Sequence, residues 1–124
     1  MTRKTFNAAG AAPIAPYSHA AYAGDIIFCS GQLPLDASGK IVEGDIKAQT
    51  EQCFENCFNV LAAAGLTSDD VVKVTVFLTN MDDFAGMNEV YKNKFTPPYP
   101  ARSAIGVAAL PMGASIEIEM IVKG

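Results

Sequence analysis

The sequence predicts an α+β domain in which two helices cover one face of a mixed β-sheet. Runs rich in β-branched and aromatic residues occur near the start, in the middle and at the end of the chain. Two longer segments between them carry apolar residues at helical spacing. With 124 residues, half of them hydrophobic, the chain can bury a core, so we expect one domain over residues 1–124.

The first third of the chain is predicted to form an extended segment followed by a hairpin. Residues 7–16 contain two prolines and one glycine, which disfavour a helix. Strands are predicted over residues 17–23 and 25–30, with Gly24 at the turn between them. Residues 33–43 have the composition of a loop.

The middle of the chain is predicted to form a helix, a strand and a second helix. Asp45 is a good N-cap for the first helix, which should end at Gly65. The strand covers residues 71–78, and Asn80 or Asp82 should cap the second helix. In the strand, Val72, Val74, Val76 and Leu78 are predicted to form one apolar face, and in the second helix Phe84, Met87, Tyr91 and Phe95 lie at helical intervals before a proline-rich stop.

Two C-terminal strands carry an arginine and two glutamates with few other charges nearby. They are predicted over residues 102–107 and 116–122, and the proline and glycine between them indicate a turn. Alternation places Glu117 and Glu119 on the face opposite the apolar residues of their strand. We therefore predict a hairpin that brings Arg102 within reach of a glutamate.

Composition excludes several classes of function. A net charge of −4 and a pI near 4.8 argue against general binding to nucleic acid, and no basic residues interleave with the aromatic ones. The sequence shows no signal peptide and no apolar run of membrane-spanning length. Three cysteines are too few for a secreted disulfide framework, so a cytosolic location is expected.

Metal binding is not expected, although Cys53 and Cys57 are four residues apart on one predicted helix face. A structural zinc site needs four ligands and a catalytic one three, whereas Cys29 and His19 belong to other segments. Cys53 and Cys57 should instead pack in the buried stripe of their helix. The single histidine, His19, forms no Ser-His-Asp arrangement, so a structural or surface role is favoured over that of a general base.

Arg102 is the best candidate for a ligand-binding residue. It follows a stiff, proline-rich turn and is surrounded by small residues, Ala101, Ser103, Ala104 and Gly106, which leave room for a ligand. A planar guanidinium in such a place can hold a carboxylate by two parallel hydrogen bonds. A structural ion pair with a glutamate is the alternative interpretation.

Motifs spread over nearly the whole chain point to a known family. They are APYS at residues 15–18, SGQLP at 30–34, AAGL at 63–66, VKVTVFL at 72–78, Phe84 with Met87 and Asn88, PARS at 100–103 and IEIE at 116–119. Together they closely resemble the RidA family of reactive intermediate deaminases, also called the YjgF or L-PSP endoribonuclease family.

The resemblance implies a chorismate-mutase-like α+β fold assembled as a homotrimer, with clefts between subunits. It implies hydrolysis of enamines and imines such as 2-aminoacrylate and 2-aminocrotonate to 2-oxo acids and ammonia, without a cofactor. Arg102 and Glu117 match the family's catalytic positions, and Glu119 is the second choice of carboxylate. The residues that match positions lining the cleft or binding substrate are Tyr17, Ser30, Gly31, Asn88 and Ala104.

One departure from the family pattern and two alternative functions remain. Many members have a cysteine where this chain has Ala104, so its substrate preference can differ. The family's older name implies an endoribonuclease that inhibits translation, which the acidic charge disfavours. A non-catalytic small-molecule-binding or chaperone-like protein could use the same clefts.

Overall fold

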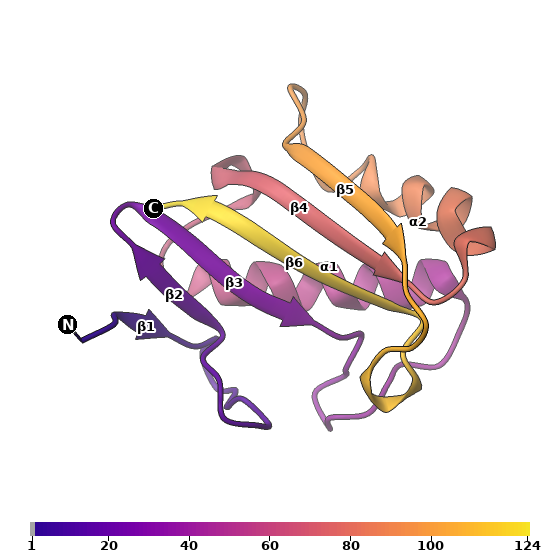
Figure 1. Cartoon of the computed structure of the whole chain (residues 1–124), viewed down its shortest axis with the longest axis horizontal. Coiled ribbons are helices and arrows are strands. Elements are labelled where there is room, and N and C mark those ends of the chain that lie inside the picture. Colours follow the sequence, from indigo (N-terminus) through magenta and orange to yellow (C-terminus); the bar gives the residue numbers. More distant parts are fainter. Residues whose placement is uncertain (1) are drawn as a thin grey trace.

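The chain folds into one six-stranded mixed sheet with both helices on the same side (Figure 1). The computed structural model describes residues 2–124. The predicted α+β class, with two helices on one face of a mixed sheet, is confirmed. The strands are β1 (Thr5–Phe6), β2 (Ala20–Ala23), β3 (Ile26–Gln32), β4 (Val71–Leu78), β5 (Ala101–Gly106) and β6 (Ile116–Lys123), and the helices are α1 (Ile46–Ala62) and α2 (Phe84–Tyr91).

The strands lie in the order β1-β2-β3-β6-β4-β5. β4 and β5 run parallel and are connected through α2, whereas the other neighbouring pairs are antiparallel. Parallel strands need a crossover of this kind, because a tight turn can join only antiparallel strands. β5 is thus an edge strand, and β6 occupies the middle of the sheet.

The predicted hairpin between the last two strands is wrong, because β4 lies between β5 and β6 (Figure 1). β5 leaves α2 and joins β4 as the second strand of a parallel unit. β6 pairs with β3 and β4, where its alternate residues Ile116, Ile118 and Met120 are buried under the helices. Strand pairing therefore does not bring Arg102 beside a glutamate.

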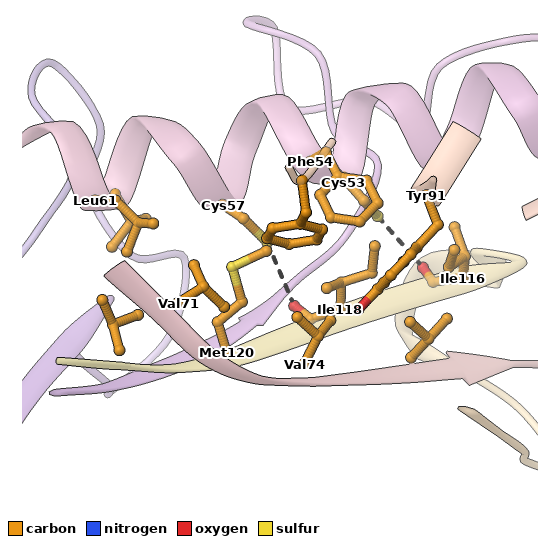
Figure 2. Packing of buried hydrophobic residues seen from close by; sticks show 14 of the residues in the cluster. Cys53, Phe54, Cys57, Leu61, Val71, Val74, Tyr91, Ile116, Ile118 and Met120 are labelled. Carbon is orange, nitrogen blue, oxygen red and sulfur yellow. Dashed lines mark hydrogen bonds between the residues drawn. The ribbon is translucent and has the colours of Figure 1, made fainter. Parts of the chain in front are cut away.

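Helix α1 packs its apolar stripe on the sheet, as predicted. The side chain of Asp45 caps the helix by accepting a hydrogen bond from Ala48 N at 3.1 Å. Cys53 and Cys57 are buried, and their thiols donate weak hydrogen bonds to the carbonyls of Ile116 and Ile118 (Figure 2). This confirms that both cysteines belong to the core.

A β-bulge changes one predicted apolar position in β4. The register with β6 shifts between Val71 and Lys73. As a result Val71 is buried and Val72 is 45% exposed, the reverse of the alternation expected from the sequence. A bulge inserts one residue, so every side chain before it changes face.

The face of the sheet opposite the helices has no layer over it in the single chain (Figure 1). Phe28 and Ile105, which lie on this open face, are about half exposed. None of the helices in the described part of the chain has the length and apolar content of a membrane span.

Candidate functional site

The guanidinium of Arg102 is held in place by side chains of α2. Its Nη1 donates a hydrogen bond of 2.6 Å to Asn88 Oδ1. Its central carbon lies 4.7 Å from the ring centroid of Tyr91 and 5.5 Å from that of Phe84. The two rings and the amide fix the plane of the guanidinium, while the residue as a whole stays exposed at the sheet edge. Its remaining donors are available to a ligand.

The aromatic support of Arg102 was missed by sequence reasoning. Helical spacing predicts Phe84 and Tyr91 as apolar members of their helix without a link to Arg102, yet with Asn88 they occupy one face of α2 at spacings of four and three residues. A polar residue between two aromatic residues on one helix face was the available signal. The parallel crossover from β4 through α2 to β5 places that face beside Arg102.

Tyr91 supports Arg102 through its ring rather than through its hydroxyl. The residue is 6% exposed and lies between α2 and the sheet (Figure 2). Its hydroxyl has no hydrogen-bond partner among residues 2–124. A buried polar group without a partner costs about 1 to 3 kcal/mol.

We expect Tyr91→Phe to keep the cation–π support and to remove that cost. The variant should be more stable than the native protein by about 1 kcal/mol and melt a few degrees higher. Thermal unfolding followed by circular dichroism measures this. Tyr91→Leu is the matched control, since it also removes the hydroxyl but removes the ring, and it should impair ligand binding at Arg102. A lower melting temperature for Tyr91→Phe would show that the hydroxyl is bonded in solution.

The carboxylate of Glu117 lies on the open face of the sheet, against Gly31. A methyl group at Gly31 would lie 2.8 Å from Glu117 Cδ and closer still to Oε2, so a larger residue at this position would have to displace the carboxylate. Burial, and next the negative charge of Glu119, raise the pKa of Glu117. A raised pKa lies closer to neutral pH, where a general acid-base catalyst is most effective.

Tyr17 and Ser30 lie on the same face as Glu117. Ser30 Oγ donates to Ser18 O at 2.7 Å, which joins β3 to the segment that carries Tyr17. A hollow of about 480 Å³ on this face is lined by residues that include Tyr17, Ser30 and Glu119. Gly31 and Glu117 do not line the hollow.

The predicted site residues therefore form two groups on opposite faces of the sheet. Arg102 pairs with Val74, whose side chain is buried under the helices, and it contacts α2. Glu117 pairs with Phe77 and alternates with the buried residues of β6, so it points away from the helices. One copy of the chain cannot bring Arg102 and Glu117 to the same small ligand.

Ala104 lies on the helix side of β5, two residues after Arg102. It pairs with Val76 and packs partly buried against the core.

Cys29, the least buried thiol, has a pKa raised to about 11 by burial, so it is protonated at neutral pH. Among residues 2–124, no cluster of three or more His, Cys, Asp and Glu side chains is arranged to hold a metal ion.

The contact between Gly31 and Glu117 leads to a testable prediction. Gly31→Ala should displace the carboxylate and lower kcat/KM about tenfold, because errors in the placement of a catalytic group are costly. Gly106→Ala is the matched control, since its methyl group would lie 3.1 Å from the flexible Met81 side chain and in ordinary contact, at 3.9 Å, with Leu78 O. Steady-state kinetics of both variants measure the difference. Equal effects would show that the position of Glu117 does not limit turnover.

Comparisons with known proteins agree with the fold and the motifs. Residues 8–123 match a family model described as Endoribonuclease L-PSP. A RutC family protein of Pyrococcus horikoshii is 53% identical over 110 residues, which cover 88% of this chain and 87% of that protein. A 2-iminobutanoate/2-iminopropanoate deaminase of Bos taurus is 44% identical over 123 residues, covering 98% and 90%. The crystal structure of RidA from an Antarctic Psychrobacter is 46% identical, covers 91% of this chain and 92% of that one, and superposes with a TM-score of 0.86.

Proposed function

Because the chain belongs to the RidA family, whose model is described as Endoribonuclease L-PSP, we propose that it is an imine deaminase. Its substrates are short 2-imino acids and their enamine forms, such as 2-aminoacrylate and 2-aminocrotonate, and its products are 2-oxo acids and ammonia. The observation that carries this proposal is the exposed, pre-oriented guanidinium of Arg102, together with relatives that are named 2-iminobutanoate/2-iminopropanoate deaminases.

In the proposed mechanism Arg102 binds the carboxylate of the substrate. Two parallel N–H···O bonds to the carboxylate contribute roughly 1.5 to 3 kcal/mol each. Asn88 and Tyr91 hold the guanidinium plane in advance, so little side-chain freedom is lost on binding. This fixes the imine carbon relative to the catalytic carboxylate.

Glu117 acts on the water and on the leaving group. The substrate reacts as its protonated iminium form: Glu117 takes a proton from water as the water oxygen bonds to the iminium carbon and the C=N π electrons move to nitrogen, which gives a neutral tetrahedral carbinolamine. The protonated Glu117 then gives its proton to the amine nitrogen, and the C–N bond breaks as ammonia leaves. The hydroxyl proton returns to Glu117 as the carbonyl of the 2-oxo acid forms, and Glu117 passes it to the departing ammonia. General acid-base catalysis of this kind contributes about 10² to 10⁴ in rate.

The site requires two copies of the chain. Arg102 with Asn88 lies at the β5 edge on the helix side, whereas Tyr17, Ser30, Gly31 and Glu117 lie on the open face. Two different surfaces that meet head to tail generate a closed ring when the rotation between neighbouring copies closes. The family resemblance suggests a ring of three, which would also cover the exposed apolar side chains of the open face.

The direct test generates 2-aminoacrylate in situ with a serine dehydratase and follows release of the 2-oxo acid. The native protein should accelerate release over the spontaneous rate, and no acceleration would refute the proposed function. Light scattering of the same preparation should give the mass of a trimer. A monomeric mass would contradict the two-copy site.

Cleavage of RNA, which the family description also names, fits the site less well. His19 is 6% exposed, and its Nδ1 already accepts a hydrogen bond from Ala8 N, so it is not placed to exchange protons with RNA. The net charge of −4 also disfavours phosphate binding. Purified protein that hydrolyses imines should release no fragments from labelled messenger RNA.

The three free cysteines support a reducing location such as the cytosol.

A further inference from the structure

His19 connects two parts of the chain that are far apart in sequence. It lies just before β2 and is 6% exposed; with Thr50 it makes up the buried polar residues of the described chain. Its Nδ1 accepts a hydrogen bond from Ala8 N at 3.0 Å, and its backbone N–H donates to Asn7 Oδ1 at 2.9 Å. These two bonds fasten the start of β2 to the chain eleven and twelve residues earlier.

The two bonds close a loop that carries a proposed cleft residue. Residues 9–18 run between the anchors and are largely exposed, and the backbone bonds within this loop are short-range turns. Tyr17 lies at the end of the loop, with its ring centroid 6.2 Å from that of His19. Ser30 continues the connection toward the site, because its backbone N–H donates to His19 O and its hydroxyl donates to Ser18 O.

The hydrogen bond from Ala8 requires a neutral imidazole with its proton on Nε2. A backbone N–H can only donate, so Nδ1 must accept, and protonation of Nδ1 would set two donors against each other. Burial lowers the pKa of His19, which favours this neutral form. The titratable neighbours are Tyr17 on the loop and Cys29 on β3 opposite Ala20, and burial keeps that thiol protonated.

We propose that His19 is a positioning residue whose neutral imidazole fixes residues 9–18 and thereby holds Tyr17 in the imine-binding cleft. The inference rests on the proposed function, since Tyr17 matters only if the cleft binds substrate. Without the hydrogen bond from Ala8 to His19, residues 9–18 hold Tyr17 in its binding-competent position for only part of the time. The apparent affinity for substrate falls in proportion to the fraction of time spent in that position, whereas the chemical step at Glu117 is unchanged.

Two substitutions at His19 distinguish the effect of losing the hydrogen bond from Ala8 from the effect of lowering the stability of the whole protein. His19→Asn places an acceptor oxygen where Nδ1 stands, so it should keep the bond from Ala8 N. His19→Leu keeps apolar volume and removes the acceptor. Thr50→Val is the matched control, because it removes the other buried polar side chain, whose hydroxyl donates to Ile46 O within α1, away from the cleft.

We expect His19→Leu to raise KM about tenfold with little change in kcat, as for a loop that is competent a tenth of the time. His19→Asn should restore the native KM, and Thr50→Val should leave KM unchanged even if it lowers the melting temperature. Amide hydrogen exchange over residues 8–18 should be faster in His19→Leu than in the native protein and in His19→Asn. Native exchange in His19→Leu, or a fall in kcat alone, would overturn the inference.

Acid pH gives an independent readout. Binding of 2-oxobutanoate by the native protein should weaken as pH falls through the range in which His19 gains a proton, and His19→Asn should lack that part of the decline. Glu117 titrates in both proteins, so their difference isolates His19. Identical profiles would overturn the inference. If the native protein neither hydrolyses imines nor binds 2-oxobutanoate, the proposed function itself fails, and the role in substrate binding fails with it.

Discussion

Replacing Glu117 by glutamine lowers kcat about 10²- to 10⁴-fold and leaves binding of 2-oxobutanoate largely intact. Glutamine has the same shape and keeps the packing against Gly31, but it cannot take a proton from water or return one to the amine. The assay is release of 2-oxo acid from 2-aminoacrylate generated in situ, with calorimetric binding of 2-oxobutanoate alongside. A non-catalytic binding protein would show the same binding and no turnover in the native form.

Glu119→Gln is the matched control for Glu117→Gln, because it makes the same change two residues along the same face of β6. It should keep kcat within about tenfold of native. The charge of Glu119 helps to raise the pKa of Glu117, so its removal should move the acid limb of the pH–rate profile to lower pH. A larger loss of kcat in Glu119→Gln than in Glu117→Gln would exchange the roles of the two carboxylates.

The stability of Glu117→Gln provides a check on folding. The folded-state pKa of Glu117 lies above its unfolded value, so the native state binds the proton more tightly. The contribution of Glu117 to the free energy of unfolding is therefore fully present below its unfolded-state pKa. This contribution is lost as pH rises through the folded-state pKa. The charged carboxylate therefore destabilises the chain at neutral pH, and the glutamine variant should melt no lower than native protein at pH 7. A lower melting temperature would mean that a partner group stabilises the charge.

Replacing Arg102 by lysine lowers kcat/KM roughly 10- to 150-fold, which corresponds to the loss of one charge-assisted hydrogen bond of 1.5 to 3 kcal/mol. Lysine keeps the positive charge but lacks the planar fork, and its ammonium loses the stacking on the Tyr91 ring. Because Arg102 is exposed at an edge strand and lysine keeps its charge, the loss of the ring and amide contacts should lower the melting temperature by only a few degrees. Near-native turnover in Arg102→Lys would show that the carboxylate of the substrate is bound elsewhere.

Local features of the chain could be predicted from the sequence. Asp45 caps α1, and Cys53 and Cys57 are buried, because capping and helical spacing involve residues only a few positions apart. The alternation in β6 likewise placed Glu117 on the correct face. These features depend on periodicity, which each segment carries by itself.

The neighbours of each strand could not be predicted in the same way. Alternation shows which side chains share a face of the sheet but not which strand lies alongside. For this reason the sequence predicts a hairpin of β5 with β6, whereas β4 lies between them in the structure. The bulge near Val72 and the burial of His19 also depend on distant partners. For the same reason, the separation of Arg102 from Glu117 by the sheet emerged only from the fold.

The most direct test of the two-copy site is complementation between two inactive variants. Arg102→Ala and Glu117→Gln are expressed together with different tags, and the mixed oligomers are purified through both tags in turn. In a head-to-tail ring of three that contains both variants, about one site in three combines a native Arg102 with a native Glu117 from its neighbour. The mixed oligomers should therefore regain about a third of native turnover. Turnover no greater than that of the separately purified variants would contradict a site shared between two copies.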